Sequence, residues 1–258
     1  MRIGIVQHDI VWADAEANLA TVGALIDGMP AADLYVLPEM FSTGFVTEPD
    51  KCPSLPADSQ RALAWMKERA MSMGKALAGS IATPTDNTHW ANRLSVALPD
   101  GTVTAYDKRH LFAYGGEDRC YAQGQQRVVA NVGGVRMLLL VCYDLRFPVW
   151  SRCRGDYDAI VYVANWPESR IGAWNTLLRA RAIENQCYVV GVNRVGDDPQ
   201  CHYCGASAII GPKGETLAAC NDEGRTETAL TDIDLAALQR FREHFPVLRD
   251  ADGFKTEQ

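Results

Sequence analysis

Short apolar segments alternate along the chain with longer segments whose apolar residues recur every three or four positions. The short segments predict buried β-strands over residues 2–7, 33–39, 75–83, 135–144, 157–166 and 187–196. The longer segments predict helices over residues 14–27, 57–74 and 174–186. The second of these helices has Asp58 or Ser59 as its expected N-cap and Gly74 as its expected stop.

Two hairpins interrupt this alternation. Residues 93–108 hold two alternating segments around Pro99-Asp100-Gly101, and residues 206–220 turn at residues 211–214. Residues 227–245 add a last strand and a last helix. About ten strands and four or five helices are therefore expected, with connections long enough for parallel pairing. Because the apolar strands are apolar throughout, the sheet should be buried on both faces, and the predicted fold class is α/β.

Composition narrows the class of protein. The chain has 258 residues, 47% of them hydrophobic, which supports one large domain over residues 1–258. Its net charge of −7 comes without a basic block, so nucleic-acid binding is not indicated. No apolar stretch approaches the roughly 20 residues that a bilayer span needs, and the N-terminus has no export-signal pattern. We expect a soluble, cytoplasmic protein that does not enter membranes.

The cysteines do not indicate a disulfide framework or a metal centre. The eight cysteines are scattered along the chain, and in a reducing compartment most should be free thiols. Cys201 and Cys204 form a C-x2-C pair around His202, but a zinc site normally needs a second pair of ligands. No such pair lies nearby in the sequence, so we predict no metal site.

Three reactive side chains stand at the ends of predicted strands. Glu39 ends the strand of residues 33–39, Lys108 ends the first hairpin, and Cys142 follows the apolar run of residues 135–141. Ligands bind beyond the carboxyl ends of strands in open α/β sheets, so the three are candidates for one site. Each alone has an ordinary explanation, since free cysteine packs as a small hydrophobe and Glu and Lys are mostly exposed.

Together the three residue types suit acyl transfer. A nearby cation favours the thiolate of Cys142, and the Lys108 ammonium can also stabilise an oxyanion on an attacked carbonyl. Glu39 can accept the thiol proton and return it to a leaving amine. Cys142 would then carry a covalent acyl intermediate, and no histidine is required.

Three segments resemble the nitrilase superfamily of carbon-nitrogen hydrolases. They are LPEMFSTGF around Glu39, YDKRHLF around Lys108 and VCYDLRFP around Cys142, and the resemblance extends over nearly the whole chain. It implies a four-layer α-β-β-α sandwich, commonly dimerised through helices, with Glu39, Lys108 and Cys142 as the catalytic triad. It also implies an enzyme that needs neither a metal nor an organic cofactor.

The same resemblance implies further site residues. Glu117 corresponds to a second active-site glutamate, which would hold Lys108 and position substrate or water. Asp118 is the neighbour with which it is most easily confused, and an exposed loop acid is the alternative. The backbone N–H of Tyr143, just after the nucleophile, would complete the oxyanion hole with Lys108.

The residues after the nucleophile indicate a substrate class. Nitrilases proper tend to carry Cys-Trp-Glu, whereas this chain has Cys-Tyr-Asp at 142–144, like the amidase branches. Together with residues 164–186, this segment is most similar to bacterial ω-amidases. Those enzymes hydrolyse the terminal amide of 2-oxoglutaramate and 2-oxosuccinamate to the 2-oxo acid and ammonia.

Such substrates carry a carboxylate, so the pocket needs a cation. Arg146 is one candidate, because a guanidinium fork suits a carboxylate, and Arg170 is another. The alternative for Arg146 is a structural pairing with a buried acid. Trp166, Phe41 and Phe45 either wall the pocket or pack elsewhere.

Other functions stay open at this point. The same triad can act on an N-carbamoyl amino acid, deaminated glutathione or an aliphatic amide, because small pocket changes decide the substrate. A binding protein without activity would be expected to have lost a triad member, and a redox or metal role for the cysteines is a further alternative. The expected partners are a small amide substrate and a second copy of the chain in a homodimer.

Overall fold

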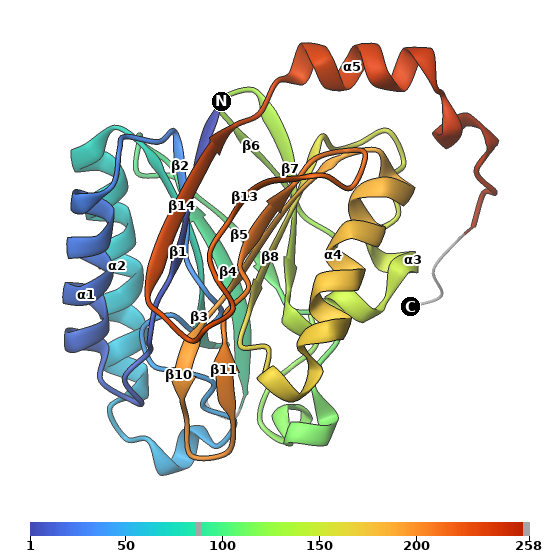
Figure 1. The fold of residues 1–258 in the computed structure, drawn as a ribbon. Helices are drawn as coiled ribbons and strands as arrows, with labels where there is room; N and C mark the ends of the chain where they lie inside the picture. Colours follow the sequence, from blue (N-terminus) through green and yellow to red (C-terminus); the bar gives the residue numbers. More distant parts are fainter. Residues whose placement is uncertain (86–88, 255–258) are drawn as a thin grey trace.

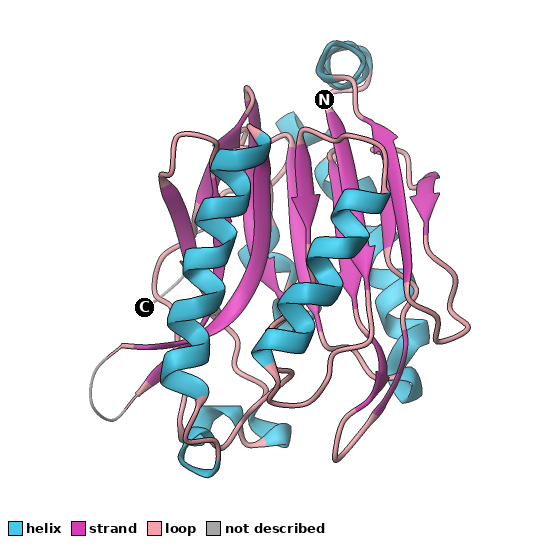
Figure 2. Ribbon diagram, turned by 90° about the vertical axis from the view of Figure 1, so that its left-hand side faces the viewer, coloured by secondary structure: helices cyan, strands magenta, loops and turns pink. Residues whose placement is uncertain are grey.

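Two six-stranded sheets pack face to face between outer helices in the computed structural model, which describes residues 1–85 and 89–254 (Figure 1). The first sheet has the strand order β14-β1-β2-β3-β4-β5, in which β1, β2 and β3 are parallel neighbours. Its strands are β1 (Arg2–Gln7), β2 (Leu34–Val36), β3 (Ala76–Pro84), β4 (Trp90–Ala97), β5 (Val103–Asp107) and β14 (Glu227–Asp232). Helices α1 (Ala15–Gly28) and α2 (Leu55–Met73) cover its outer face, in front of the strands in Figure 2.

The second sheet has the order β13-β12-β9-β8-β7-β6, in which β7, β8 and β9 are parallel. Its strands are β6 (Val129–Val132), β7 (Val135–Val141), β8 (Ala159–Ala164), β9 (Tyr188–Asn193), β12 (Ala208–Ile210) and β13 (Thr216–Ala219). Helices α3 (Pro148–Ser151) and α4 (Ile171–Asn185) lie outside this sheet (Figure 1). A separate ribbon pairs β10 (Val195–Asp197) with β11 (His202–Cys204), and α5 (Leu235–His244) lies above the sheets.

Alternate side chains of the first sheet face two different cores. Ile5 and Val36 point between the sheets and belong to one apolar cluster with the strands of the second sheet. Val6 and Leu37, each one residue further on, belong to a second cluster with α1 and α2. This period of two places both faces of the inner strands β1 and β2 in apolar surroundings, as the sequence pattern indicated.

The predicted helices and strands are present, with differences where the local sequence signals were misread. The N-cap of α2 is Ser54, not Asp58 or Ser59, because Pro56 stands in the first turn, where a missing N–H costs nothing. Gly74 ends the helix as predicted, at φ 64°. The segment 187–196, expected as one strand, divides into β9 and β10.

Within the described residues, none of the helices is both long enough and apolar enough to cross a membrane.

Candidate active site

Glu39, Lys108 and Cys142 meet beyond the carboxyl ends of β2, β5 and β7. The side chains of Glu39 and Lys108 are completely buried, and Lys108 Nζ donates a hydrogen bond to Glu39 Oε1 at 2.9 Å. Cys142 remains partly exposed, because its thiol borders a pocket. The structure therefore brings together the three residues that the sequence placed at strand ends.

Glu117 completes the charge cluster. It lies in a short 3₁₀-helix, η3 (Glu117–Arg119), and is completely buried. Lys108 Nζ donates to both of its carboxylate oxygens, at 3.1 and 2.9 Å, and the backbone N–H of Phe112 donates to Oε2 at 2.6 Å. Glu117 is thus not an exposed loop acid, whereas its neighbour Asp118 is exposed.

Two asparagines that the sequence did not indicate hold the carboxylates. Asn92 Nδ2 donates to Glu39 Oε1 at 2.7 Å and to Glu117 Oε1 at 2.9 Å. The backbone N–H of Asn165 donates to Glu39 Oε2 at 2.7 Å. Asn165 directly follows β8, so it could have been found at a strand end in the same way as Cys142. Asn92 lies inside β4, where its polar side chain is the only sequence signal of a role in the site.

Burial and charge set the protonation states of the cluster. Burial alone would lower the pKa of the Lys108 ammonium, but the Glu117 and Glu39 carboxylates outweigh it and raise that pKa. Burial raises the pKa of Glu117, and Lys108 offsets only part of the rise. Burial and the Glu39 carboxylate also hold the pKa of Cys142 well above its usual range, although Lys108 acts in the opposite direction. The resting thiol is therefore neutral near pH 7, and the cation does not by itself produce a thiolate.

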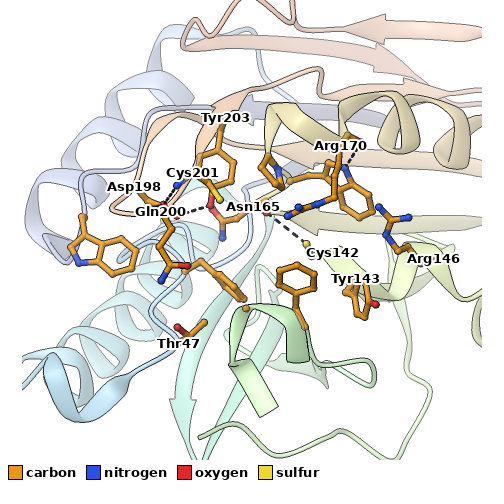
Figure 3. A pocket seen from close by; sticks show the side chains of 16 residues that line it. Thr47, Cys142, Tyr143, Arg146, Asn165, Arg170, Asp198, Gln200, Cys201 and Tyr203 are labelled. Atoms are coloured by element: carbon orange, nitrogen blue, oxygen red, sulfur yellow. Dashed lines mark hydrogen bonds between the residues drawn. The ribbon is translucent and has the colours of Figure 1, made fainter. Parts of the chain in front are cut away.

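The turn at the nucleophile presents Cys142 to the pocket. Cys142 has φ 44° and begins a short 3₁₀-helix, η4 (Cys142–Arg146), immediately after β7. Its Sγ lies 3.9 Å from the carbonyl oxygen of Asn165 (Figure 3). Tyr143 stands in the first turn of η4, where backbone N–H groups have no acceptor within the helix. An oxyanion-binding role for this N–H remains a prediction.

Sixteen residues line the pocket around Cys142 (Figure 3). Five of them were candidates from the sequence besides Cys142 itself: Phe45, Tyr143, Arg146, Trp166 and Arg170. Phe41 is not among them, because it is completely buried between the first sheet and its helices, where its ring centroid lies 6.2 Å from that of Trp65. For Phe41 the structure thus shows the packing alternative.

The two arginines stand in the pocket wall, each over an aromatic ring. The Arg146 guanidinium lies over the Trp166 ring, 5.0 Å from its centroid, and that of Arg170 lies 5.3 Å from the centroid of Phe112. Among residues 1–85 and 89–254, neither guanidinium forms an ion pair. Arg146 is exposed, so it does not pair with a buried acid there.

The tip of the β10–β11 ribbon forms a wall that the sequence did not indicate. Asp198, Gln200, Cys201 and Tyr203 all line the pocket. Asp198 shapes the tip, because its Oδ1 accepts the backbone N–H groups of Gln200 and Cys201 at 2.7 Å and its Oδ2 accepts the Tyr203 hydroxyl at 2.5 Å. In the described part of the chain, no three potential ligand side chains gather into a metal-binding group.

A buried Glu-Lys-Glu cluster beside a cysteine at a strand end, between two sheets with outer helices, defines a class of enzyme. The family model for carbon-nitrogen hydrolases matches residues 2–243, and the chain belongs to this family of carbon–nitrogen bond hydrolases. The four-layer fold expected from the resemblance is confirmed: a CN-hydrolase superfamily protein from Xanthomonas campestris, solved with an arsenic adduct in its active site, superposes with a TM-score of 0.92. It is 41% identical, and the match covers 100% of this chain and 99% of that one.

Similar proteins point to the amidases of the family. The chain is 44% identical over 256 residues to omega-amidase YafV of Escherichia coli (strain K12), with 99% of this chain and 98% of the relative covered. It is 34% identical over 255 residues to the 2-oxoglutaramate amidase of Bacillus subtilis (strain 168), with 96% of each covered. The family and the relatives together make this chain an amidase.

Proposed function

We propose that this enzyme hydrolyses the terminal amide of small 2-oxo acid amides, 2-oxoglutaramate and 2-oxosuccinamate, to the 2-oxo acid and ammonia. One observation carries the proposal: a buried ammonium shared by two carboxylates borders a nucleophilic cysteine whose pocket wall holds two guanidinium groups without ion-pair partners in the described chain. The relatives named omega-amidase and 2-oxoglutaramate amidase support the same substrate class.

The first half of the reaction acylates the enzyme. The Glu39 carboxylate accepts the proton of the Cys142 thiol as the sulfur attacks the amide carbon, which matches a thiol that is neutral at rest. Lys108 remains an ammonium, because its two carboxylates raise its pKa, and it stabilises the oxyanion together with the N–H of Tyr143. Glu39 then gives the proton to the departing nitrogen. Ammonia leaves, and the acyl group stays on Cys142 as a thioester.

The second half returns the free enzyme. Glu39 removes a proton from a water molecule, whose oxygen attacks the thioester carbon, and the same oxyanion contacts form again. The carbon–sulfur bond breaks, the acid leaves, and the proton returns to the Cys142 sulfur. Glu117 and Asn92 keep Lys108 and Glu39 in place throughout, through hydrogen bonds of 2.7 to 3.1 Å.

Arg146 and Arg170 are the groups that we assign to the substrate carboxylate, with Trp166 and Phe45 as apolar walls. Replacing Arg146 by Leu should raise KM for 2-oxoglutaramate by about 10- to 100-fold, because a hydrogen bond to a charged group contributes about 1.5–3 kcal/mol. An aliphatic amide without a carboxylate should be turned over as before. Arg154→Leu, a surface change outside the pocket lining, is the matched control.

Ammonia release from a panel of compounds tests the proposal. The panel holds 2-oxoglutaramate, 2-oxosuccinamate, N-carbamoyl-β-alanine, an aliphatic amide and a nitrile, each with the wild type and with Cys142→Ala. The proposal predicts that the 2-oxo acid amides have the highest kcat/KM and that the variant is inactive. A higher kcat/KM for another compound would refute the substrate class and leave the triad chemistry in place.

We also propose that residues 1–258 form one domain and that the enzyme is a cytoplasmic homodimer. All eight cysteines are free, which suits a reducing compartment. Val149 on α3 and Ile183 on α4, the helices outside the second sheet, are each 54% exposed, and we assign the dimer contact to these helices. Light scattering gives the molar mass of the purified protein and of Ile183→Glu, and comparing the two molar masses tests the dimer.

A further inference from the structure

The side chain of Asp144 is a buried four-way hydrogen-bond acceptor two residues after the nucleophile. Its Oδ2 accepts the Tyr106 hydroxyl at 2.8 Å and the Val141 backbone N–H at 3.0 Å. Its Oδ1 accepts the backbone N–H of His110 at 3.0 Å and His110 Nδ1 at 2.7 Å. The carboxylate is completely buried, so these bonds are shielded from water.

These partners flank the two reacting groups in sequence. Tyr106 stands two residues before Lys108 and His110 two residues after it, while Val141 directly precedes Cys142. The Asp144 carboxylate thus binds residues on both sides of Lys108 in the sequence and the residue directly before Cys142. No step of the mechanism uses Asp144, Tyr106 or His110 directly.

Such a link is needed because the lysine and the cysteine belong to different sheets. Lys108 follows β5, the edge strand of the first sheet, and Cys142 follows β7 of the second sheet. Facing sheets are held mainly by apolar packing, which is not directional. The hydrogen bonds that Asp144 accepts from Tyr106 and His110 are directional, and they fix the end of β5 against η4.

The strained backbone of Cys142 needs the same support. A φ of 44° is uncommon for a residue with a side chain, and such conformations persist where the surroundings hold them. The bond from the Val141 N–H to Asp144 closes the turn around Cys142.

The partners of Asp144 are themselves fixed. The His110 ring stacks on Phe147, with centroids 3.9 Å apart and planes 9° apart. The Tyr106 hydroxyl accepts the indole N–H of Trp150 at 3.1 Å. Phe147 and Trp150 follow η4 in the segment that begins with Cys142. Their contacts with His110 and Tyr106 therefore also connect this segment to the residues around Lys108.

We propose that Asp144, with Tyr106 and His110, is the positioning device that sets the distance between the Lys108 ammonium and the Cys142 thiol. The three are positioning residues, and they act on rate by placing the oxyanion-stabilising charge. This inference rests on the proposed Glu39–Lys108–Cys142 chemistry, so one of its tests below uses no substrate.

Steady-state kinetics give the first test. Asp144→Asn removes acceptor capacity at unchanged size, and Tyr106→Phe and His110→Ala each remove one partner. Misplacement of a catalytic group by about 1 Å costs about 100-fold in rate, so kcat should fall about 100-fold in Asp144→Asn while KM changes less than about threefold. The matched control is Asp158→Asn at the opposite end of β8, which weakens partly exposed ion pairs with Arg136 and Arg242 and should leave kcat within about twofold. An equal loss of kcat in the control and in Asp144→Asn would overturn the proposal.

A double-mutant cycle tests whether Tyr106 and His110 both act through the Asp144 carboxylate. The double variant Tyr106→Phe/His110→Ala should lose less rate than the product of the two single losses, because both changes release the same carboxylate. His110→Asn, which keeps a donor near the position of Nδ1, should recover part of the rate lost in His110→Ala. Fully multiplicative losses with no recovery would contradict the proposal.

Labelling with iodoacetamide, followed by peptide mass spectrometry, needs no substrate. Cys52 is half-buried and serves as the reference thiol, and the completely buried Cys187 reports general loosening. In Asp144→Asn, labelling of Cys142 relative to Cys52 should slow about tenfold, because a displaced ammonium no longer favours the thiolate, while Cys187 stays unlabelled. Unchanged labelling of Cys142, or labelling of Cys187 together with it, would overturn the proposal. A slowed Cys142 in a protein that releases no ammonia would uphold it and refute the amidase function alone.

Discussion

At the scale of single residues, the site depends on one ammonium shared between two carboxylates. Lys108 donates to Glu39 and Glu117, and all three side chains are completely buried. Burial and the Glu39 carboxylate raise the pKa of the Cys142 thiol, so the thiol keeps its proton at rest. In the proposed mechanism Glu39 transfers protons, Lys108 stabilises the oxyanion, and Glu117 holds the Lys108 ammonium in place.

Replacing Glu117 by Gln should lower kcat by about 100-fold with little change in KM. The change removes one of the two charges that hold the Lys108 ammonium and disturbs a group that acts in the transition state. Steady-state rates of ammonia release give kcat and KM for the variant. Asp118→Asn, at the exposed neighbour, is the matched control and should retain wild-type kcat; equal losses in both variants would contradict the role of Glu117.

The raised thiol pKa predicts a pH dependence of stability. The unfolded thiol titrates near about 8.5, whereas the folded Cys142 keeps its proton to higher pH because of burial and Glu39. The stabilisation linked to Cys142 is therefore fully present below about pH 8.5 and is lost as the pH rises through the folded pKa.

Urea unfolding of the wild type and of Cys142→Ala from pH 6 to 10 measures this effect. The difference in unfolding free energy between the two proteins should be constant up to about pH 8 and should then change in favour of the variant. A difference that stays constant to pH 10 would show that the folded thiol has an ordinary pKa.

The sequence predicted part of the site, and the position of each residue in the chain explains which part. Glu39, Lys108 and Cys142 could be found because each is a reactive side chain at a strand end. Asn92 could not, since its role comes from two carboxylates that approach it from other parts of the chain. Phe41 and Phe45 stand in the same segment, and only the backbone path decides which ring faces the pocket.

At the scale of elements, the position of Lys108 depends on the segment that packs against the end of β5. The backbone N–H of Gly124 donates to the carbonyl oxygen of Lys108 at 2.9 Å. A Cβ on Gly124 would lie 1.9 Å from the carbonyl oxygen of Asp107, so the two backbones are in contact. Glycine is required here for this close approach.

Gly124→Ala should therefore destabilise the protein by about 2 kcal/mol or more and displace Lys108. Thermal unfolding and residual activity measure the two effects. Gly172→Ala, in α4 with open space around the new Cβ, is the control and should be neutral or stabilising by up to about 1 kcal/mol. A Gly124→Ala protein as stable and active as the control would contradict the packing argument.

The limits of prediction at this scale come from element length. The helices and the long apolar strands show several periods of their pattern, and most of them were found. The strands β10 and β11 have three residues each, which is too few to show a period of two. The pocket wall that their ribbon forms was therefore not predicted. The start of α2 was misplaced because two capping signals competed with a proline before them.

At the scale of the whole molecule, the two sheets share one apolar core. The cluster between them includes strands from both sheets, among them Ile5 and Val36 on one side and Leu139 and Val161 on the other. The hydrophobic pattern indicated buried strands, but only the family resemblance implied their division into two sheets. Periodicity shows that a strand face is buried and does not show which element covers it. The pairing of Arg2 with Asp232, across nearly the whole chain, has no local signal at all.

Leu34→Ala, in this shared core, should cost about 2–5 kcal/mol in unfolding free energy. If residues 1–258 form one domain, unfolding in urea should remain a single transition, with loss of activity and loss of far-ultraviolet circular dichroism at the same urea concentration. Two separated transitions would show that the sheets fold independently.

The covalent intermediate itself provides the most direct test of the Cys142 chemistry. The enzyme is quenched in acid during turnover of 2-oxoglutaramate, digested and mapped by mass spectrometry. We expect a 2-oxoglutaryl group on the peptide that contains Cys142. Hydroxylamine should remove it, and it should be absent from Cys142→Ala, which should release no ammonia. Ammonia release that persists in Cys142→Ala, or an acyl group on another residue, would contradict this chemistry.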